Sequence, residues 1–232
     1  MIETIAFDAD DTLWDNESRY QWGKQRFTLL LQEFSSPEEA GQRLDETEMR
    51  NVSLFGYGVK SFVLSMIETS IVISDGRIRG EQTQQIVEIA KDILAAPLDV
   101  YHRVEETLEA LAGAYRMMLI TKGDPFEQEM KIARTGLGKY FEHIEIVGEK
   151  SEATYRAIMQ RYSIRPESFI MVGNSMRSDI LPVLRLGGQA VYIPQENTWF
   201  HENSDENPQG SDGYYELEHL WQLPALLRNL EK

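Results

Sequence analysis

The stretch IAFDADDTLWD, residues 5–15, places four carboxylates within eight positions directly behind an apolar run. Residues 5–7 read as the end of a buried strand, so Asp8 lies at the edge where functional groups collect in parallel sheets. Asp8 and Asp10 are two positions apart, and in extended backbone their side chains lean to the same side. Two such carboxylates repel each other unless a cation or a shared proton intervenes. The stretch therefore predicts either a functional site at a strand end or a solvated acidic turn.

Four later segments repeat the signature of this first short strand. The predicted strands cover 2–7, 115–121, 143–147, 168–173 and 189–193. Helical periodicity is found over 102–113, 125–135, 151–162 and 176–186. Short apolar runs separated by helical stretches indicate a parallel sheet that is covered on both faces. The predicted fold class is α/β, with a doubly wound, mostly parallel sheet.

The interval between the first two strands contains no convincing strand. Helical periodicity appears at 17–34, 37–50, 58–73 and 81–95, and an apolar seam is expected from Leu29, Leu30, Phe34, Phe62, Met66 and Ile73. An insertion of this length is too long for a simple crossover, which indicates a second domain. We expect an α/β core domain of residues 1–15 and 98–232 and an all-helical domain of residues 16–97.

The composition restricts the partners and the compartment. The formal net charge is −15, which repels nucleic-acid phosphates and anionic lipid, so neither a nucleic acid nor a membrane is an expected partner. No uninterrupted apolar run reaches the roughly 18 residues that a membrane helix needs, and no signal-peptide pattern opens the sequence. The sequence has no cysteine, which excludes thiol catalysis and is compatible with a reducing compartment. The expected location is the cytoplasm.

Residues whose side chains could take part in binding or catalysis also follow the other predicted strands. Thr121 ends the second strand, Lys150 follows the third, and Gly173-Asn174-Ser175-Met176-Arg177-Ser178-Asp179 follows the fourth. Thr121 offers a hydroxyl and neighbouring backbone N–H groups suited to phosphate oxygens. Each residue alone has an ordinary explanation, such as a surface role for Lys150 or a helix N-terminus for Asp179. Their order and their common edge make a functional site the stronger interpretation.

In this ordered set the chain resembles the haloacid dehalogenase superfamily over essentially its whole length. Asp8-x-Asp10-x-Thr12 looks like the first motif of the superfamily, Thr121 the second, Lys150 the third and Gly173 through Asp179 the fourth. The resemblance implies a Rossmann-like core. The long insertion is similar to the all-helical cap that many small-metabolite phosphatases carry between the first two motifs. The motifs are specific for the superfamily but carry little information about the substrate.

The resemblance implies hydrolysis of phosphomonoesters through an aspartyl-phosphate. Asp8 would attack phosphorus, and Asp10 would protonate the departing alkoxide and later deprotonate a water. Thr121 would hold the phosphoryl oxygens, and Lys150 would balance charge beside the nucleophile. Carbon–halogen cleavage needs neither an acid for the halide nor a metal, so the presence of Asp10 and Asp179 favours phosphate esters over dehalogenation.

Mg²⁺ is the cofactor that the resemblance implies, because it prefers oxygen ligands and bridges carboxylate and phosphate oxygens. The expected ligands are Asp8, the backbone carbonyl of Asp10, and Asp179. Asn174 stands where the fourth motif usually has its first acid. It removes a negative charge but keeps an oxygen that can bind a metal-bound water, so we expect magnesium binding to persist at lower affinity.

The expected substrate is a small phosphorylated metabolite. Phe55-Gly56-Tyr57-Gly58-Val59-Lys60 interrupts the helical pattern, and Tyr57 and Lys60 are candidate contacts for the leaving group, as is Lys122 beside Thr121. A helix-connecting loop with a solvated lysine is the alternative there. A phosphosugar mutase or a dehalogenase of the same superfamily, and a receiver-like signalling protein that accepts a phosphoryl group, are the alternative functions. We expect a monomer or a homodimer.

Overall fold

The computed structural model describes residues 1–195, 199, 204, 206 and 208–231. In this part of the chain six strands form one sheet in the order β3-β2-β1-β4-β5-β6, and every neighbouring pair is parallel. The strands are β1 (Thr4–Phe7), β2 (Arg116–Lys122), β3 (His143–Val147), β4 (Phe169–Gly173), β5 (Gln189–Tyr192) and β6 (Tyr214–Glu216). The predicted α/β class is confirmed, and the sequence patterns missed only β6 among these strands.

The strand order reverses at β1, which pairs with β2 on one side and with β4 on the other. In open α/β sheets, ligands bind beyond the carboxyl ends of the strands at such a switch point. The ends of β1 and β4 are therefore where this topology prepares a site. A receiver-like sheet of the flavodoxin type has the order 2-1-3-4-5, so the observed order contradicts the receiver alternative.

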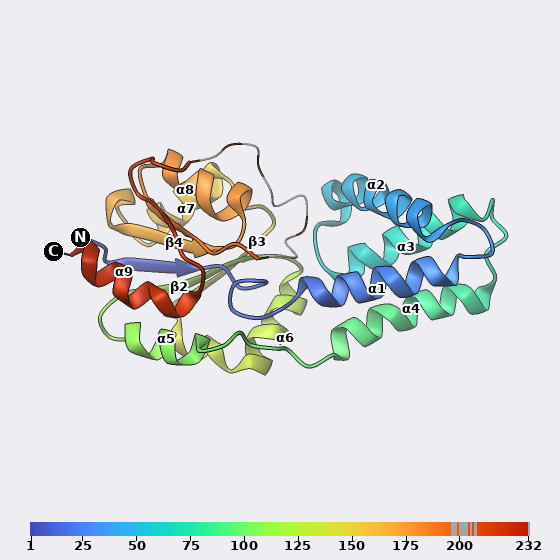
Figure 1. Ribbon diagram of the computed structural model, residues 1–232, viewed down its shortest axis with the longest axis horizontal. Helices are drawn as coiled ribbons and strands as arrows, with labels where there is room; N and C mark the ends of the chain where they lie inside the picture. Colours follow the sequence, from blue (N-terminus) through green and yellow to red (C-terminus); the bar gives the residue numbers. More distant parts are fainter. Residues whose placement is uncertain (196–198, 200–203, 205, 207, 232) are drawn as a thin grey trace. The chain divides into compact units, whose positions relative to one another are not determined.

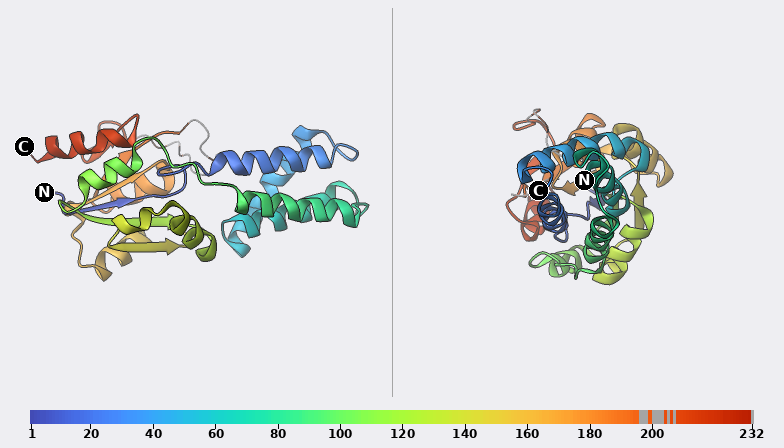
Figure 2. Two further views of the ribbon diagram at one scale, coloured as in Figure 1. Left: turned by 90° about the horizontal axis from the view of Figure 1, so that it is seen from below. Right: turned by 90° about the vertical axis from the view of Figure 1, so that its right-hand side faces the viewer.

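Every side chain of β1 is buried because helices cover both faces of the sheet. Alternate residues of a strand point to opposite faces: Ile5 and Phe7 belong to one apolar cluster, and Ala6 belongs to another. The first cluster includes side chains of α5 (Val104–Leu111), α6 (Pro125–Thr135) and α9 (Leu223–Leu230), and the second includes α7 (Glu152–Arg161) and α8 (Leu181–Arg185). These two layers are visible in Figure 1, and Figure 2 shows α5 and α9 lying on the same side of β1.

Short helical segments complete the α/β layers. Among the residues that the structure describes, 3₁₀ helices cover Leu137–Tyr140, Pro166–Ser168 and Leu220–Gln222, and a π-helix covers Met176–Ile180. The helical stretch predicted over 176–186 is confirmed in extent, but its first part is the π-helix and only Leu181–Arg185 is α-helical. Pro182 stands in the first turn of α8, a helical position that proline tolerates.

Contacts divide the chain into two compact units. The α/β unit comprises Met1–Glu17, Leu98–Lys122 and Gln128–Lys232, and the helical unit comprises Ser18–Pro97 and Gly123–Glu127. The second segment of the helical unit contains the first turn of α6. Lys60 Nζ lies 2.7 Å from Asp124 Oδ2, and the Val59 N–H donates to Glu127 Oε2 at 2.9 Å. These bonds explain why this turn groups with the helices of the insertion.

Four helices build the helical unit around its own apolar core. They are α1 (Glu17–Leu30), α2 (Pro37–Phe55), α3 (Val59–Ile73) and α4 (Gly80–Ala95). The core contains Phe27, Leu31, Ala40, Leu44, Val59, Phe62, Met66, Ile86, Ile89, Ala90 and Ile93. Phe62 and Met66 lie in the core, and Leu30, Phe34 and Ile73 pack against it, as the predicted seam requires. Leu29 is 58% exposed, so its place in the seam is wrong.

Local sequence sets the two ends of α2. The Ser36 hydroxyl oxygen accepts the Glu39 N–H at 3.2 Å, and Pro37 occupies the first turn. Such a cap satisfies an N–H that has no partner within the helix. At the other end Gly56 adopts a φ of 74°, which glycine does without steric cost. The predicted start of this helix is confirmed, but it continues past residue 50 to Phe55.

Burial makes Glu48 on α2 sensitive to pH. Burial raises the pKa of the Glu48 carboxyl to about 8; the charge of Asp45 adds to this rise, and that of Lys24 opposes it. The folded protein therefore keeps a proton that the unfolded chain releases above its ordinary pKa of 4.5, and stability falls as pH rises through this window. We expect Glu48→Gln to be more stable than wild type at about pH 8, by roughly 1–3 kcal/mol, and equally stable near pH 4. Urea unfolding at both pH values tests this, and the same result for exposed Glu46→Gln would contradict the role of burial.

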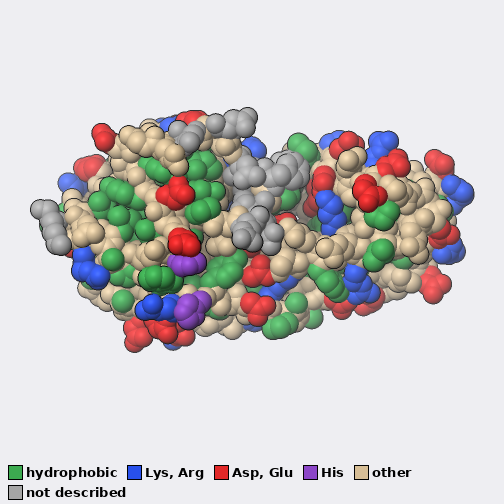
Figure 3. Space-filling view, viewed as in Figure 1, with side chains coloured by type: hydrophobic (Ala, Val, Ile, Leu, Met, Phe, Trp, Pro, Cys, Tyr) green, Lys and Arg blue, Asp and Glu red, His purple; other side chains and the backbone are tan. Residues whose placement is uncertain are grey.

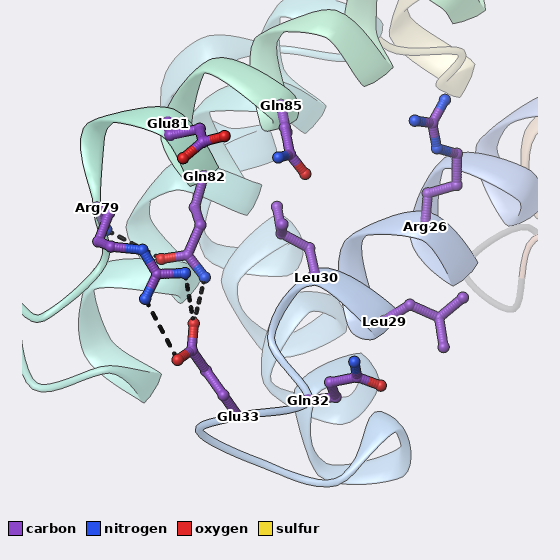
Figure 4. Close-up of a pocket in the computed structure, with 9 residues that line it drawn as sticks. All are labelled: Arg26, Leu29, Leu30, Gln32, Glu33, Arg79, Glu81, Gln82 and Gln85. Atoms are coloured by element: carbon purple, nitrogen blue, oxygen red, sulfur yellow. Dashed lines mark hydrogen bonds and ion pairs between the residues drawn. The ribbon is translucent and has the colours of Figure 1, made fainter.

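A cavity of about 530 Å³ opens within the helical unit (Figure 4). Its lining includes Arg26, Leu29, Leu30, Glu33, Arg79 and Gln82. Arg79 Nη2 lies 2.9 Å from Glu33 Oε1, and Gln82 Nε2 donates to the same oxygen at 2.6 Å. Arg26 pairs with Asp92 at 3.0 Å. Arg26, Glu33 and Arg79 thus bind partners in the protein, so this cavity is not our candidate active site.

The surface and the helices bear on the expected partners. On the face in Figure 3, acidic side chains are scattered among basic and polar ones over both units. The charge of −15 is thus not gathered in one patch on that face. Among the described residues, no helix has the length and apolar character needed to span a membrane.

Candidate active site

The site begins where β1 ends. The Asp8 N–H donates to the Val172 carbonyl at 2.9 Å, which extends the β1–β4 pairing through the first residue of the acidic stretch. Asp8 is 7% exposed. Its side chain is therefore held at the switch point of the sheet and is largely removed from water.

Lys150 joins the ends of two strands through its ammonium group. Its Nζ donates to Asp8 Oδ1 and, at 2.7 Å, to Asp179 Oδ1. The Lys150 side chain is 2% exposed, and that of Asp179 is 1% exposed. Burial opposes the charge of Lys150, but Asp179 and Asp8 outweigh it and raise the pKa of the lysine above its ordinary value. The ammonium is thus present at neutral pH.

The carboxylates of this cluster outnumber its cation. Burial raises the pKa of Asp8 to about 7, with Lys150 opposing the rise and Asp179 adding to it. When both carboxylates are ionised, one negative charge is in excess in a place with little water. An additional cation would lower the free energy of that state and restore an ionised Asp8.

The fourth motif holds Asp179 in the space left by the missing side chain of Gly173. Asp179 Oδ2 accepts the Ser175 N–H at 3.0 Å, and the π-helix Met176–Ile180 carries the carboxylate back over the end of β4. A Cβ on Gly173 would stand 2.2 Å from Asp179 Oδ2 and 2.4 Å from its Cγ. The glycine therefore makes room for the carboxylate, which explains its place at the start of the motif.

Thr12 links the first motif to Asn174. Its hydroxyl lies 3.0 Å from Asp8 Oδ2 and 3.1 Å from Asn174 Oδ1. A hydroxyl has a single hydrogen to donate, so the two oxygens share one donor. Asn174 is 6% exposed. The amide oxygen that replaces the usual acid thus lies in the same buried cluster as Asp8.

Asp10 makes a separate set of bonds. Its Oδ1 accepts the Trp14 Nε1–H at 2.7 Å, and its Oδ2 accepts the Gln128 amide at 3.0 Å. Lys131 Nζ lies 2.9 Å from Oδ2 and 3.1 Å from Oδ1. Both oxygens of this carboxylate are therefore fixed by donors from α6 and from the turn after β1.

Thr121 and Lys122 stand at the end of β2. The Thr121 hydroxyl accepts the Gln128 amide at 2.7 Å, and the same amide also lies 3.0 Å from Asp10 Oδ2. Gln128 thereby connects the predicted phosphoryl-binding residue to the predicted acid–base residue. Lys122 Nζ donates to Ser178 Oγ at 2.9 Å, which ties β2 to the π-helix of the fourth motif.

Asp11, a third carboxylate of the opening stretch, has a structural role. Its Oδ1 accepts the backbone N–H groups of Asn16 and Glu17, each at 2.9 Å, at the start of α1. Its backbone has a φ of 60°, in the left-handed region that Asp tolerates better than most residues. The acidic stretch therefore combines a structural cap at Asp11 with the two carboxylates of the candidate site.

The predicted site residues fall into two groups. Asp8, Asp10, Thr121, Lys122, Lys150, Asn174 and Asp179 all belong to the α/β unit, at the carboxyl ends of β1, β2, β3 and β4. Tyr57 and Lys60 belong to the helical unit. There Lys60 Nζ pairs with Asp124 Oδ2, so its ammonium already has a partner in the protein.

Sequence reasoning missed the residues of α6. Gln128 and Lys131 are three positions apart, so they share one face of this helix. Their spacing within the predicted helix 125–135 was visible, but nothing in it distinguished a buried lysine from a solvated one. The distances to Asp10 and Thr121 supply that distinction.

The donor set fits a divalent cation that prefers oxygen. Asp8 and Asp179 supply carboxylate oxygens, Asn174 supplies an amide oxygen, and the excess negative charge favours a cation. In the described residues there is no group of three or more acidic, histidine or cysteine side chains that could hold a metal ion. A cation here would therefore keep several water ligands, which is the habit of Mg²⁺.

Comparisons with known proteins show the family to which the chain belongs. The haloacid dehalogenase-like hydrolase family matches residues 2–187. A crystal structure of a haloacid dehalogenase-like family hydrolase from Xanthomonas campestris is 38% identical, with a TM-score of 0.87 over 99% of this chain and 91% of that one.

Two phosphatases are similar at lower identity. The glyceraldehyde 3-phosphate phosphatase of Methanothermobacter thermautotrophicus is 24% identical over 85% of this chain and 88% of its own. The N-acylneuraminate-9-phosphatase of Rattus norvegicus is 23% identical over 99% of this chain and 95% of its own. The family match spans the helical unit and the first four strands, together with all the predicted site residues. The chain belongs to the haloacid dehalogenase-like hydrolase family.

Proposed function

We propose that this protein is a magnesium-dependent phosphomonoester hydrolase that acts on a small phosphorylated metabolite through an aspartyl-phosphate at Asp8. The observation that carries the proposal is the buried Asp8–Lys150–Asp179 cluster at the switch point of the sheet. It provides a desolvated nucleophile and a fixed positive charge. The similarity to two phosphatases supports the same reaction class.

The first step is the attack of an Asp8 oxygen on phosphorus. The bond between phosphorus and the ester oxygen breaks, and Asp10 gives a proton to the departing alkoxide. Lys150 and the hydroxyl of Thr121 bind oxygens of the phosphoryl group and of Asp8. When Mg²⁺ is bound by Asp8, Asp179 and the carbonyl of Asp10, it supplies charge neutralisation for the nucleophile and the phosphate.

The second step restores the enzyme. A water attacks phosphorus, the bond between Asp8 and phosphorus breaks, and the water proton passes to Asp10. Inorganic phosphate leaves and Asp8 returns to its carboxylate. Asp10 thus acts as acid and then as base, a role typically worth about 10² to 10⁴ in rate.

We assign the helical unit the role of a cap that selects the leaving group. Tyr57 and Lys60 are its proposed contacts, together with Lys122 from the α/β unit. The two relatives are named for different substrates, glyceraldehyde 3-phosphate and an N-acylneuraminate 9-phosphate. Their names therefore support a phosphorylated metabolite as the class and do not select a member of it.

The test is phosphate release from a panel of phosphorylated metabolites and from 4-nitrophenyl phosphate. We expect turnover with added Mg²⁺, loss of turnover with a chelator, and recovery when Mg²⁺ is restored. Folding is followed in parallel by circular dichroism, so that loss of activity is separated from loss of structure. A folded protein that hydrolyses no phosphomonoester with Mg²⁺ would contradict the proposal.

Asn174→Asp tests how the fourth motif sets the affinity for magnesium. An aspartate keeps an oxygen beside the Thr12 hydroxyl, 3.1 Å away in the wild type, and adds a negative charge to the donor set. We expect the concentration of Mg²⁺ that gives half-maximal activity to fall by about 3- to 30-fold, which corresponds to roughly 1–2 kcal/mol. Asn174→Ala serves as the matched loss of the oxygen. An unchanged or higher half-maximal concentration of Mg²⁺ in Asn174→Asp would exclude this explanation.

A further inference from the structure

Lys131 lies on α6, and its charged ammonium group binds the Asp10 carboxylate. Its Nζ reaches both carboxylate oxygens, at 2.9 and 3.1 Å, and also donates to Asn16 Oδ1 at 2.7 Å. The Lys131 side chain is only 11% exposed, whereas the side chains of Lys60 and Lys139 are 64% and 61% exposed. A buried ammonium loses hydration, so it persists there because of these specific partners.

The bonds to Asp10 fix the direction of its carboxylate. Trp14 Nε1 holds Oδ1 at 2.7 Å, and Gln128 Nε2 holds Oδ2 at 3.0 Å. With Lys131, three donors from two parts of the chain surround one side chain. A carboxylate with freely rotating dihedrals would spend most of its time in other orientations.

The same network connects Asp10 to the phosphoryl-binding residue. The Gln128 Nε2 that faces Asp10 also lies 2.7 Å from the Thr121 hydroxyl and 2.7 Å from the Lys122 carbonyl, so three oxygens share its two hydrogens. The position of Asp10 is thereby set relative to the end of β2. That relation matters most when a water must lie between Asp10 and a phosphoryl group held by Thr121.

We propose that Lys131 is a positioning residue for the second half of the reaction. It holds Asp10, together with Gln128 and Trp14, as an acceptor aimed to take the proton from the water that attacks the aspartyl-phosphate. In that step the water oxygen bonds to phosphorus, the bond from phosphorus to Asp8 breaks, and the proton moves to Asp10. This assignment rests on the proposed function, because it requires a phosphoryl group on Asp8.

The test separates the two steps with 4-nitrophenyl phosphate, whose leaving group departs without a proton donor. In Lys131→Met we expect the first release of nitrophenolate to slow by less than about 3-fold, and hydrolysis of the phosphoenzyme to slow by about 10- to 100-fold. Rapid mixing would then show a burst of nitrophenolate equal to the enzyme concentration, and acid quenching would trap the phosphoenzyme. Lys131→Arg, which keeps the charge and the reach, is expected to restore most of the second step.

Lys139→Met is the matched control, since it removes an exposed lysine that pairs with Glu105 at 2.8 Å. It should leave both phases unchanged. A lysine with a merely structural role would slow both steps together or lower the melting temperature alone, and either result would overturn the assignment. If the wild type turns over and Lys131→Met is unaltered, this assignment alone is wrong. If the wild type forms no phosphoenzyme and shows no turnover, the proposed function fails as well.

Discussion

Asp8→Asn is expected to abolish phosphate release, with a loss of about 10⁴-fold or more in turnover. An amide oxygen is a poor nucleophile, and variants of hydrolases that lack the nucleophile keep only the modest rate provided by binding. The asparagine keeps the shape of the side chain. Its oxygen can still accept from Lys150, and its NH2 group can donate to the Thr12 hydroxyl, which keeps Asn174 Oδ1 as its acceptor, so the loss reports chemistry and not collapse of the site.

The stability of Asp8→Asn should be at least that of the wild type. Burial is the main cause of the raised pKa of Asp8, with Asp179 adding to it, which means that the ionised carboxylate is unfavourable where it stands. Removing that charge leaves Lys150 paired with Asp179 alone, at 2.7 Å. Sites that are arranged for chemistry often gain stability when the reactive group is neutralised.

Three measurements decide this prediction. Steady-state release of phosphate gives the turnover, acid-quenched protein gives the amount of phosphoenzyme, and urea unfolding gives the stability. Asp92→Asn provides a matched control, because Asp92 lies exposed on α4 and pairs with Arg26. It is expected to keep full activity. Substantial turnover in Asp8→Asn would show that another group attacks phosphorus.

The sheet was predictable because its signal is local. Each of the five predicted strands contains a short apolar run, as in Phe169–Gly173, where all five residues are buried between helical layers. The edge strand β6 was missed because its three residues, Tyr214–Glu216, are only partly buried or exposed and carry no such run. The C-terminal helix Leu223–Leu230 was also missed, although Leu223 and Leu227 lie in the apolar core.

The candidate site was predictable where its residues follow strands. Parallel pairing brings strand ends to one edge, so Asp8, Lys150 and Asp179 could be placed together before any distance was known. The partners of Asp10 on α6 could not be predicted in this way. Whether Lys131 faces water or Asp10 depends on how α6 packs on the sheet, which is a tertiary fact.

The grouping of Gly123–Glu127 with the helical unit could not be predicted from the sequence either. Glu127 is 5% exposed, and it accepts the first N–H of α3 from Val59 and the hydroxyl of Tyr20 at 3.3 Å. A carboxylate at a helix N-terminus is favourable. Nothing in the periodicity of 125–135 indicates that Glu127 pairs with a helix that begins 68 residues earlier, since the pairing depends on the path of the chain in space.

Lys150→Met is expected to have the largest effect on stability. Methionine is similar in length and fills the same space, but Asp8 and Asp179 lose the ammonium that they share. Removing one partner of a buried ion pair typically costs about 3–5 kcal/mol, because the remaining charge stays buried without compensation. Here two carboxylates remain, at 7% and 0% exposure. We therefore expect a loss at the upper end of this range near pH 8, measured by urea unfolding in the presence of a chelator.

The pH dependence of the variant identifies the cause of its instability. In the wild type Lys150 opposes the rise in the pKa of Asp8, which is nevertheless raised to about 7. Without Lys150 that pKa moves further up. The folded variant then binds a proton that the unfolded chain releases above its ordinary pKa of 3.8, so its stability falls more steeply with rising pH than that of the wild type. The deficit should accordingly be smaller near pH 5 than near pH 8.

A second substitution separates charge from packing. Adding Asp8→Asn to Lys150→Met removes one of the two unpaired carboxylates, so the double variant should be more stable than Lys150→Met alone by about 1–3 kcal/mol at pH 8. Packing defects left by the methionine would not respond to that change. A deficit equal at both pH values, with no recovery in the double variant, would mean that Lys150 stabilises the fold by its contacts and not by its charge. A stability deficit that grows with pH and is partly restored by Asp8→Asn would instead show that the buried carboxylates cause it. The repulsion among these carboxylates would then govern both the stability of the fold and the reactivity of Asp8.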